Sequence, residues 1–490
     1  MKIARKMGVA QGAVFTIAMR WTDRLIGFVS TLILARLLVP DDFGVVAQAS
    51  LVIGLLSVFT DLGVNIALIQ NPHAVQADYD AAWTIRLGQY LLVGLVVFLI
   101  APYAGDYFGD SRIVPVLQIM VVTLVLAGIE NIGVISFQKE MQFGLDFRFV
   151  FAKRIFGFFV TVLLAFTWQS YWSLVAGSIA GRLIGVVLSY SMHPMRPRLS
   201  IERFSNIFSV SQWTLVQGIG GYLGSNVDRF IIGGRASSTV IGGYTVANEI
   251  SAMPTSEILA PLNRVLFPAF VGAKENLSEL KRMFLMAQAV QCLIAIPASI
   301  GLALVAEEAV TVLLGEKWLL AAPFIQILAI IHAVHAITTS AGYVIVTMGK
   351  MRYIALATWS QLAVFGGTIA MFLPEAGPVE VATIRLVATC LGLFLVFWLL
   401  KQVLPNLRAW EIGVGLIRPL LGALLMALAV VWIGGLLSMS TIWILMIKIS
   451  LGATIYMAAI ILLWTAVGRP QGAESYLFQV AHSAVFKYLR

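Results

Sequence analysis

The chain has 490 residues, of which 60% are hydrophobic and only 12% are charged. Soluble domains are about 45–50% apolar and about 25% charged, so the composition excludes a string of soluble domains. The formal net charge of +9 does not in itself indicate nucleic-acid binding, because basic residues of membrane proteins gather in cytoplasmic loops.

Apolar runs long enough to cross a bilayer, about 18 residues or more, recur along the whole chain. The runs are continuous rather than alternating, which favours helices over a β-barrel. We therefore predict an all-α integral membrane protein, with both cysteines, Cys292 and Cys390, packed inside spans. In chain order the fourteen expected spans are 11–38, 43–69, 83–101, 113–136, 149–167, 172–192, 208–234, 240–270, 284–306, 321–347, 352–373, 379–401, 414–437 and 442–467.

The loops between these spans alternate in basic charge. Eighteen lysines and arginines fall on one side, and the other side has only Arg112, Arg235 and Lys317. Lys and Arg are enriched in cytoplasmic loops, so the pattern predicts an even number of spans with both termini in the cytoplasm.

A weak internal repeat suggests two halves. Arg36 ends the first span eight residues before Gly44, and Arg235 ends the seventh span eight residues before Gly243. Paired halves around a midplane site are common in transporters, so we expect two six-helix lobes related by a pseudo-two-fold axis. The expected division is an N-lobe at 1–193, a helical cytoplasmic linker at 194–207, a C-lobe at 208–403, two further spans at 404–468 and a cytoplasmic interfacial tail at 469–490.

Twelve ionisable residues are expected at membrane depth, where charges are costly and are usually functional. Nine of them fall in spans 1, 2, 7 and 8, whereas spans 9, 10, 11, 13 and 14 are expected to have none. This concentration predicts a polar cavity between the two halves. The candidates for binding an anionic substrate are Arg20, Arg24, Arg229 and Arg264, and the candidates for ion coupling are Asp23, Asp61, Glu130, Asp228, Glu249 and Glu257. Arg20, Asp23 and Arg24 share one helix face, so they could also form a self-neutralised cluster, and Asp228–Arg229 could be a structural pair.

Two motifs suggest other chemistry only superficially. Asp78-Tyr79-Asp80 matches the DxD of many glycosyltransferases, but no nucleotide-binding domain surrounds it. His332 and His335 share a helix face without an evident third ligand. We therefore predict no catalytic residue, no metal and no cofactor.

Several short motifs resemble those of Wzx-type polysaccharide flippases. These proteins form the polysaccharide transporter family of the multidrug/oligosaccharidyl-lipid/polysaccharide exporter superfamily. The motifs, in order, are Phe43-Gly-Val, Asp61-Leu-Gly, Ala67-Leu-Ile-Gln, Arg196-Pro-Arg, Asn226-Val-Asp-Arg-Phe-Ile-Ile-Gly-Gly, Ile241-Gly-Gly-Tyr-Thr-Val-Ala, Arg264-Val-Leu-Phe-Pro-Ala-Phe and Leu314-Gly-Glu-Lys-Trp-Leu-Leu-Ala-Ala-Pro.

The resemblance implies a bacterial inner-membrane flippase for undecaprenyl-pyrophosphate-linked oligosaccharides, working by alternating access in exopolysaccharide, capsule or lipopolysaccharide biosynthesis. It implies coupling to an H⁺ or Na⁺ gradient, and Arg24, Arg229 or Arg264 as the pyrophosphate ligand. Expected partners are the lipid-linked substrate, the membrane, and the polysaccharide polymerase and export machinery; nucleic acid is not expected, and a monomer suffices.

Four other functions remain open at this point. A peptidoglycan-precursor flippase has the same number of spans, and a multidrug exporter usually has twelve. A membrane-embedded polymerase or glycosyltransferase would need a larger outward loop than any this sequence offers. A structural scaffold would not explain why charge recurs in equivalent spans of both halves.

Overall fold

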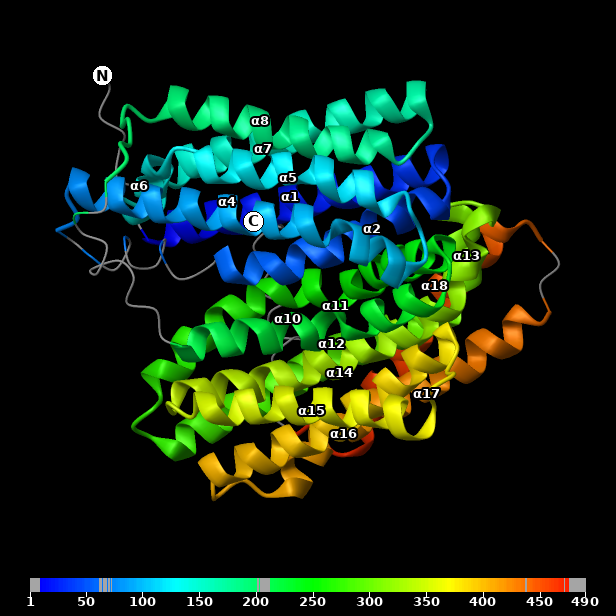
Figure 1. Cartoon of the computed structure of the whole chain (residues 1–490). Coiled ribbons are helices and arrows are strands. Elements are labelled where there is room, and N and C mark those ends of the chain that lie inside the picture. Colours follow the sequence, from blue (N-terminus) through cyan, green and yellow to red (C-terminus); the bar gives the residue numbers. More distant parts are fainter. Residues whose placement is uncertain are drawn as a thin grey trace, which may run out of the picture. The chain divides into compact units, whose positions relative to one another are not determined.

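The computed structural model describes residues 9–60, 64, 68, 71, 73–200, 202, 212–436, 439–470 and 472–475. Within these ranges it describes no side chains for residues 9–20, 23, 212–217, 256–258, 260, 261 and 264. Every regular element in the described ranges is a helix (Figure 1). The chain forms two compact units, Met1–Thr245 and Val246–Arg490, which are described separately below.

Unit 1 contains the helices of the first half of the chain, up to the start of α11. They are α1 (Val9–Leu37), α2 (Pro40–Ser57), η1 (Val58–Thr60), α4 (Gln76–Phe108), α5 (Ile113–Ile129), η2 (Ile132–Val134), α6 (Ile135–Lys139), α7 (Phe143–Trp168), α8 (Trp172–Met192), α10 (Gln212–Arg235) and the start of α11 (Ser238–Gly272). Helix α7 packs along α8 and α4 along α5, while α1 lies against α7 and α10 against α2. Helix α2 also contacts α4 and α5, and its buried residues join theirs in one apolar core.

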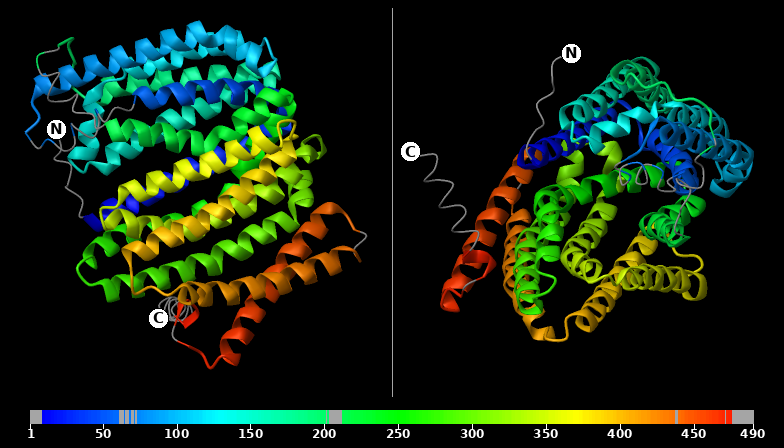
Figure 2. Two further views of the ribbon diagram at one scale, coloured as in Figure 1. Left: turned by 60° about the horizontal axis from the view of Figure 1, so that its bottom comes forward. Right: turned by 90° about the vertical axis from the view of Figure 1, so that its left-hand side faces the viewer.

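Unit 2 continues from the rest of α11. Its elements are α12 (Leu277–Leu304), α13 (Ala306–Leu313), η3 (Glu316–Ala321), α14 (Ala322–Thr347), α15 (Met351–Phe372), α16 (Pro378–Val403), α17 (Ala409–Gly434) and α18 (Thr441–Ala466). Helix α12 packs against both α14 and α17, and α16 packs against α14 and α15. The last two helices, α17 and α18, lie against each other at the orange and red end of the chain (Figure 2).

Ten helices in the described part of the chain are long and apolar enough to cross a membrane. An eleventh crossing is added if Ile113–Ile129 and Ile132–Lys139, bent by 63° at their junction, count as one broken span. Helices α1, α10 and α11 have 29, 24 and 35 residues but are not among the ten. Their sequences contain eight of the twelve predicted intramembrane charges, which lowers their hydropathy.

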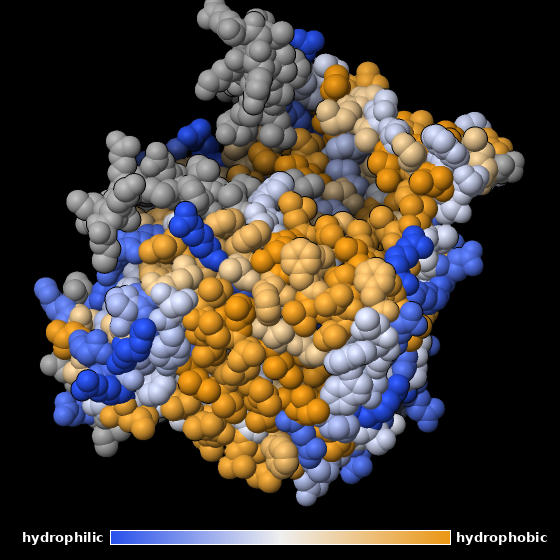
Figure 3. Space-filling model, turned by 90° about the horizontal axis from the view of Figure 1, so that it is seen from above, coloured by the Kyte–Doolittle hydropathy of each residue, from blue (hydrophilic) through white to orange (hydrophobic). Residues whose placement is uncertain are grey.

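The surfaces of these helices are strongly apolar. Large side chains such as Leu163, Phe394 and Leu428 are more than 60% exposed. Figure 3 shows a broad hydrophobic face whose hydrophilic residues gather at opposite margins. Water would disfavour so large a contiguous apolar surface, whereas lipid solvates it. The chain is therefore a multi-pass membrane protein.

The predicted fourth span, 113–136, is not one continuous helix. Helix α5 ends at Ile129, and η2 begins only at Ile132. Side chains bind the backbone groups that the break leaves open: Tyr190 donates to the Ile129 carbonyl at 3.0 Å, Arg86 donates to the Glu130 carbonyl, and Ser189 Oγ accepts from the Asn131 amide at 3.0 Å. Non-helical backbone is tolerated at membrane depth only when it is satisfied in this way. The run of apolar residues did not reveal the break.

The linker that was expected to be helical is extended where the structure describes it. Residues 193–200 have no regular structure, which follows from Pro194 and Pro197 within a few residues of each other. The Arg198 amide donates to Asp80 at 3.0 Å, and the Ser200 amide donates to Thr84 at 2.9 Å. The linker therefore lies along the first turns of α4. The tail predicted at 469–490 falls mostly outside the described residues.

Candidate functional site

Asp228 and Tyr244 form a buried polar contact between α10 and α11. Both side chains have 0% exposure, and the Tyr244 hydroxyl donates to Asp228 Oδ2. A buried carboxylate is costly unless hydrogen bonds satisfy it, and Tyr244 supplies one such bond. The hypothesis that Asp228 and Arg229 form a structural pair is wrong, because Asp228 turns toward α11 and no ion pair joins it to Arg229 among the described residues.

Arg229 is half-buried on α10 and forms no ion pair with any described residue. Its Nε is buried without a hydrogen-bond partner, and its Nη2 reaches only the Ser225 carbonyl, at 3.5 Å. Arginine is always charged and presents several donors in a planar fork that matches phosphate oxygens. Arg229 therefore has spare capacity for a negatively charged group.

The other predicted site residues fall into two groups. Arg24 is exposed on α1, and Glu249 is exposed on α11 in unit 2. The remaining predicted residues lie outside the described part of the chain: Asp61 entirely, and the side chains of Arg20, Asp23, Glu257 and Arg264. The roles of all of these residues stay predictions.

Glu130 lies at the break after α5, and its partner comes from α7. Lys153 Nζ is 2.8 Å from Glu130 Oε2, and the two side chains are 21% and 14% exposed. Gly185 of α8 leaves room for the pair, since a Cβ there would lie 2.8 Å from Lys153 Cε. Arg86 donates to the backbone carbonyl of Glu130, so two cations bind this residue. Neither cation was among the predicted site residues.

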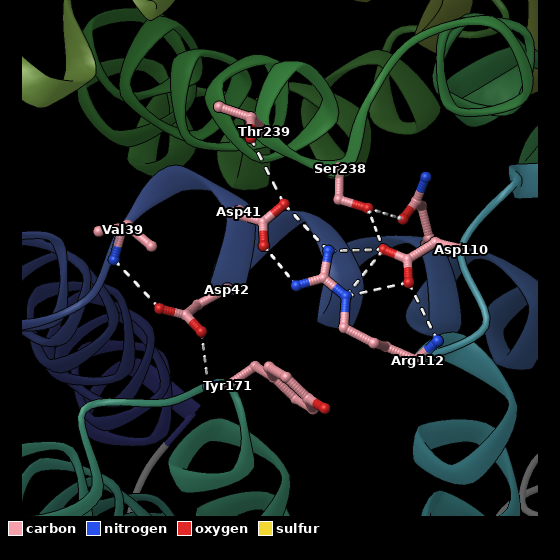
Figure 4. A network of polar contacts seen from close by, with 9 residues as sticks. Val39, Asp41, Asp42, Asp110, Arg112, Tyr171, Ser238 and Thr239 are labelled. Atoms are coloured by element: carbon pink, nitrogen blue, oxygen red, sulfur yellow. Dashed lines mark hydrogen bonds and ion pairs between the residues drawn. The ribbon is translucent and has the colours of Figure 1, made fainter.

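A second polar cluster, the Arg112 network, joins α2, the α4–α5 loop and α11 (Figure 4). Its members are Asp41, Gln48, Asp110, Arg112, Ser238 and Thr239. Arg112 lies 2.5 Å from Asp41 through Nη1 and 2.7 Å from Asp110 through Nη2. From the start of α11, Ser238 donates to Asp110 at 2.7 Å, and Thr239 lies 3.4 Å from Asp41. Sequence reasoning gave Arg112 and Asp41 no role beyond loop charge, because three separate segments bring the cluster together.

The charges of the Arg112 network are held firmly. The hydrogen bond from Arg112 lowers the pKa of Asp110 to about 2, and the bond from Ser238 acts in the same direction. The bonds to Asp110 and Asp41 raise the pKa of Arg112 in turn. Asp110 and Arg112 therefore stay ionised at any physiological pH.

Beside this network, the first turns of α2 and α11 cross with their backbones in contact. A Cβ on Gly44 would lie 1.7 Å from the Ser238 carbonyl oxygen, and a Cβ on Gly242 would lie 1.9 Å from the Pro40 carbonyl oxygen. In each helix the fifth residue faces the first residue of the other, so the crossing is locally two-fold. Only glycine permits such an approach.

Unit 2 contains charged residues in helices that were expected to have none. Arg418 of α17 lies 3.0 Å from Glu474, and Lys448 of α18 pairs with Glu308 of α13. That expectation is therefore wrong: a partner near each helix end offsets the cost of the charge.

An apolar groove of about 450 Å³ lies between α12, α17 and α18. Its walls include Pro297, Leu304, Met426, Ile449 and Met457, and Lys448 is its one charged lining residue. A groove of this composition suits a hydrocarbon chain rather than a sugar.

The two superficial motifs have structural roles. Asp78 accepts from the Val75 amide at 2.9 Å and so caps α4, while Asp80 holds the linker. His332 lies 3.3 Å from Asn248. No group of three or more metal-ligating residues occurs among the described residues.

Comparison with known sequences identifies the family. The sequence profile of the family described as "Polysaccharide biosynthesis protein" matches residues 33–323, more than half of the chain. The chain is 23% identical over 331 residues to the lipopolysaccharide biosynthesis protein WzxC of Escherichia coli (strain K12), covering 67% of each. It is 24% identical over 415 residues to the succinoglycan biosynthesis transport protein ExoT of Rhizobium meliloti (strain 1021), covering 82% of each.

Solved structures agree on the fold. The chain matches the Lipid II flippase MurJ in an inward closed conformation with a TM-score of 0.76 at 12% identity, covering 93% of this chain and 99% of that one. It also matches an inward-facing multidrug resistance MATE family transporter with a TM-score of 0.61 at 12% identity, covering 80% and 98%. The profile match and the two relatives confirm what the sequence motifs indicated: the chain belongs to the polysaccharide biosynthesis protein family of Wzx type.

Proposed function

We propose that this protein moves undecaprenyl-pyrophosphate-linked oligosaccharide repeat units across the bacterial cytoplasmic membrane by alternating access, for exopolysaccharide, capsule or lipopolysaccharide biosynthesis. The observation that carries the proposal is Arg229, a half-buried cation in a membrane protein with no ion pair among the described residues. Leaving such a charge unpaired is costly, and a diphosphate is an anion that its planar fork of donors fits.

The arrangement of helices supports the same proposal. Adding α1, α10 and α11 to the ten apolar helices and the broken span gives fourteen crossings. The lysine and arginine asymmetry of the loops would then place both termini in the cytoplasm. We keep two six-helix lobes, a monomer and association with polymerase and export machinery as parts of the proposal.

The groove between α12, α17 and α18 supports a lipid-linked cargo. Its lining is almost wholly apolar, and burying hydrocarbon gains free energy in proportion to the apolar area removed from water. We assign this groove to the polyprenyl chain of the substrate. The diphosphate and the sugars would bind to α1, α10 and α11, the helices that contain most of the predicted charges. Coupling to H⁺ or Na⁺ remains part of the proposal, with Glu249 of α11 as one candidate residue.

The test is a flipping assay in proteoliposomes, with a labelled undecaprenyl-pyrophosphate oligosaccharide detected in the opposite leaflet. Arg229→Gln should slow transfer at least about tenfold, the loss expected for a charge-assisted hydrogen bond. Arg182→Gln, at an exposed arginine of α8, is the matched control and should stay near the wild-type rate.

Other outcomes would favour the competing functions. Transfer of lipid II but not of the oligosaccharide would indicate a peptidoglycan-precursor flippase. Elongation or cleavage of the glycan without transfer would replace the transporter with a membrane-embedded polymerase or glycosyltransferase.

A further inference from the structure

The Arg112 network differs from an ordinary ion-pair cluster in how its bonds are divided between segments. All of its charges come from two segments, the start of α2 and the α4–α5 loop, which supply Asp41, Asp110 and Arg112. Helix α11 contributes no charge at this point. It contributes two hydroxyls, those of Ser238 and Thr239.

This division makes the contact with α11 separable. If the hydroxyls withdraw, Arg112 still binds Asp41 and Asp110, so no carboxylate loses its counter-ion. The side chains of Arg112 and Asp41 are already 40% and 32% exposed, so water can replace the hydroxyls. Pulling apart an ion pair would leave two uncompensated charges, whereas this separation exchanges hydroxyl hydrogen bonds for hydrogen bonds to water.

The Ser238 hydroxyl also faces more hydrogen-bond acceptors than it can satisfy. Its hydroxyl lies 2.7 Å from Asp110 Oδ2 and 3.0 Å from Gln48 Oε1, and both are acceptors. A serine hydroxyl has one proton, so it can donate to only one of them. Gln48 Nε2 already donates to the Gly233 carbonyl at 3.3 Å, which fixes its Oε1 toward Ser238. Because the Ser238 hydroxyl can satisfy only one of its two acceptors, its hydrogen bond stabilises the contact with α11 only weakly.

The backbone crossing at Gly44 and Gly242 lies directly beside these bonds. With no side chain between the two helices, α2 and α11 have no interdigitating side chains to hold them here. Two smooth surfaces can part or rotate without rearranging a packed core. The described contacts of α10 with α2 next to this point, through Gly233 and Gln48, are likewise hydrogen bonds.

We propose that the Arg112 network is a releasable clasp: Arg112 holds Asp41 and Asp110 as a fixed acceptor plate in which both carboxylates bind one guanidinium, and Ser238 and Thr239 leave it each time this end of the protein opens. The proposal rests on the alternating access of the proposed function. It names the residues that would hold the end of the protein near Arg112 closed.

The first test measures opening without any substrate. Ile232 of α10 is 1% exposed, so Ile232→Cys in a background with Cys292→Ala and Cys390→Ala reports access by a membrane-impermeant thiol reagent. Adding Ser238→Ala and Thr239→Val should speed labelling about tenfold, the shift expected from losing two hydrogen bonds. Ser237→Ala, at the exposed neighbouring hydroxyl, is the matched control and should leave the rate unchanged.

The second test stops the movement instead. Tyr107 and Gly234 lie at the same boundary but outside the network, since a Cβ on Gly234 would be 2.8 Å from Tyr107 Cζ. A short reducible crosslinker between Tyr107→Cys and Gly234→Cys should abolish transfer, and reduction should restore it.

The outcomes separate the clasp from the proposed function. Unchanged labelling in the double variant, or full transfer by the crosslinked protein, would overturn the clasp even if wild type flips its substrate. Faster labelling in a protein that flips nothing would support the clasp and refute the proposed function.

Discussion

The two ends of α5 solve the same electrostatic problem in opposite ways. Arg112 precedes its N-terminus and Glu130 follows its C-terminus, so each charge has the sign that the helix dipole disfavours. At the first end Asp41 and Asp110 neutralise the arginine, and at the other end Lys153 neutralises the glutamate. Each end therefore depends on partners from elsewhere in the chain.

The difference lies in what else depends on those partners. Around Glu130, every described partner comes from α4, α7 or α8, and these side chains also satisfy the broken backbone. Around Arg112, the contacts with α11 can be lost while the charges stay paired. The proposed clasp therefore makes the Arg112 end the movable one, whereas no described partner of Glu130 can leave without exposing a buried charge or an open backbone group. This argues against Glu130 as an ion-coupling residue, a role that remains to be tested.

The largest effect should follow from removing the cation beside the break. Lys153→Met leaves the Glu130 carboxylate largely buried and unpaired, so the free energy of unfolding should fall by about 3 kcal/mol. The measurement is thermal or denaturant unfolding of the purified protein in detergent. The double variant Lys153→Met/Glu130→Gln should recover most of the loss.

Lys281→Met is the matched control for that prediction. Lys281 is 2.7 Å from Glu411, and its side chain is also 21% exposed. Glu411 lies in the first turn of α17 and accepts from the Arg408 amide, so the helix N-terminus stabilises it without the lysine. The loss should be clearly smaller, and an equal loss would show that the break gives Glu130 no special role.

The crossing of α2 and α11 should respond next. Gly44→Ala places a Cβ 1.7 Å from the Ser238 carbonyl oxygen, so the two backbones must move apart. We expect a loss of about 2 kcal/mol in the free energy of unfolding and faster labelling of Ile232→Cys. Gly221→Ala, where a Cβ would meet nothing within 4 Å, is the control and should not destabilise the protein.

The smallest effect should come from pH. The pKa of Asp110 is lowered to about 2, so the stabilisation it provides is complete above its ordinary value of 3.8 and is lost only as the pH falls through about 2. Asp41 and Arg112 are the charged groups that face it. The reactive form of a cysteine is the thiolate, so each labelling rate is divided by that of a free thiol at the same pH. The normalised labelling of Ile232→Cys should be flat from about pH 5 to pH 8.

The same pH profile of Ile232→Cys labelling should change when Arg112→Gln is added. Removing the hydrogen bonds from Arg112 should raise the pKa of Asp110, and Asp41 nearby adds to the rise. Labelling should then be fast and should change as the pH falls toward about 4. A flat profile in this variant would show that Arg112 does not set the pKa of Asp110.

The sequence by itself determined the class of the protein. Continuous apolar runs of span length exclude strands in the membrane, because each span must satisfy its own backbone. They placed most of the helices correctly, and short motifs in order along the chain predicted the family that the profile match confirmed. Hydropathy averages over a span, so it did not detect the break at Glu130 and Asn131, two polar residues between apolar runs where the backbone does not stay helical.

Only the tertiary structure decided which charges are paired. Asp228 and Arg229 are adjacent in the sequence, but the Tyr244 hydroxyl donates to the first, whereas the second forms no ion pair among the described residues. The Arg112 network joins residues up to 198 positions apart, and neither periodicity nor local spacing carries information about such contacts. A charge's role depends on what faces it in space, and in this protein the facing groups come from other helices.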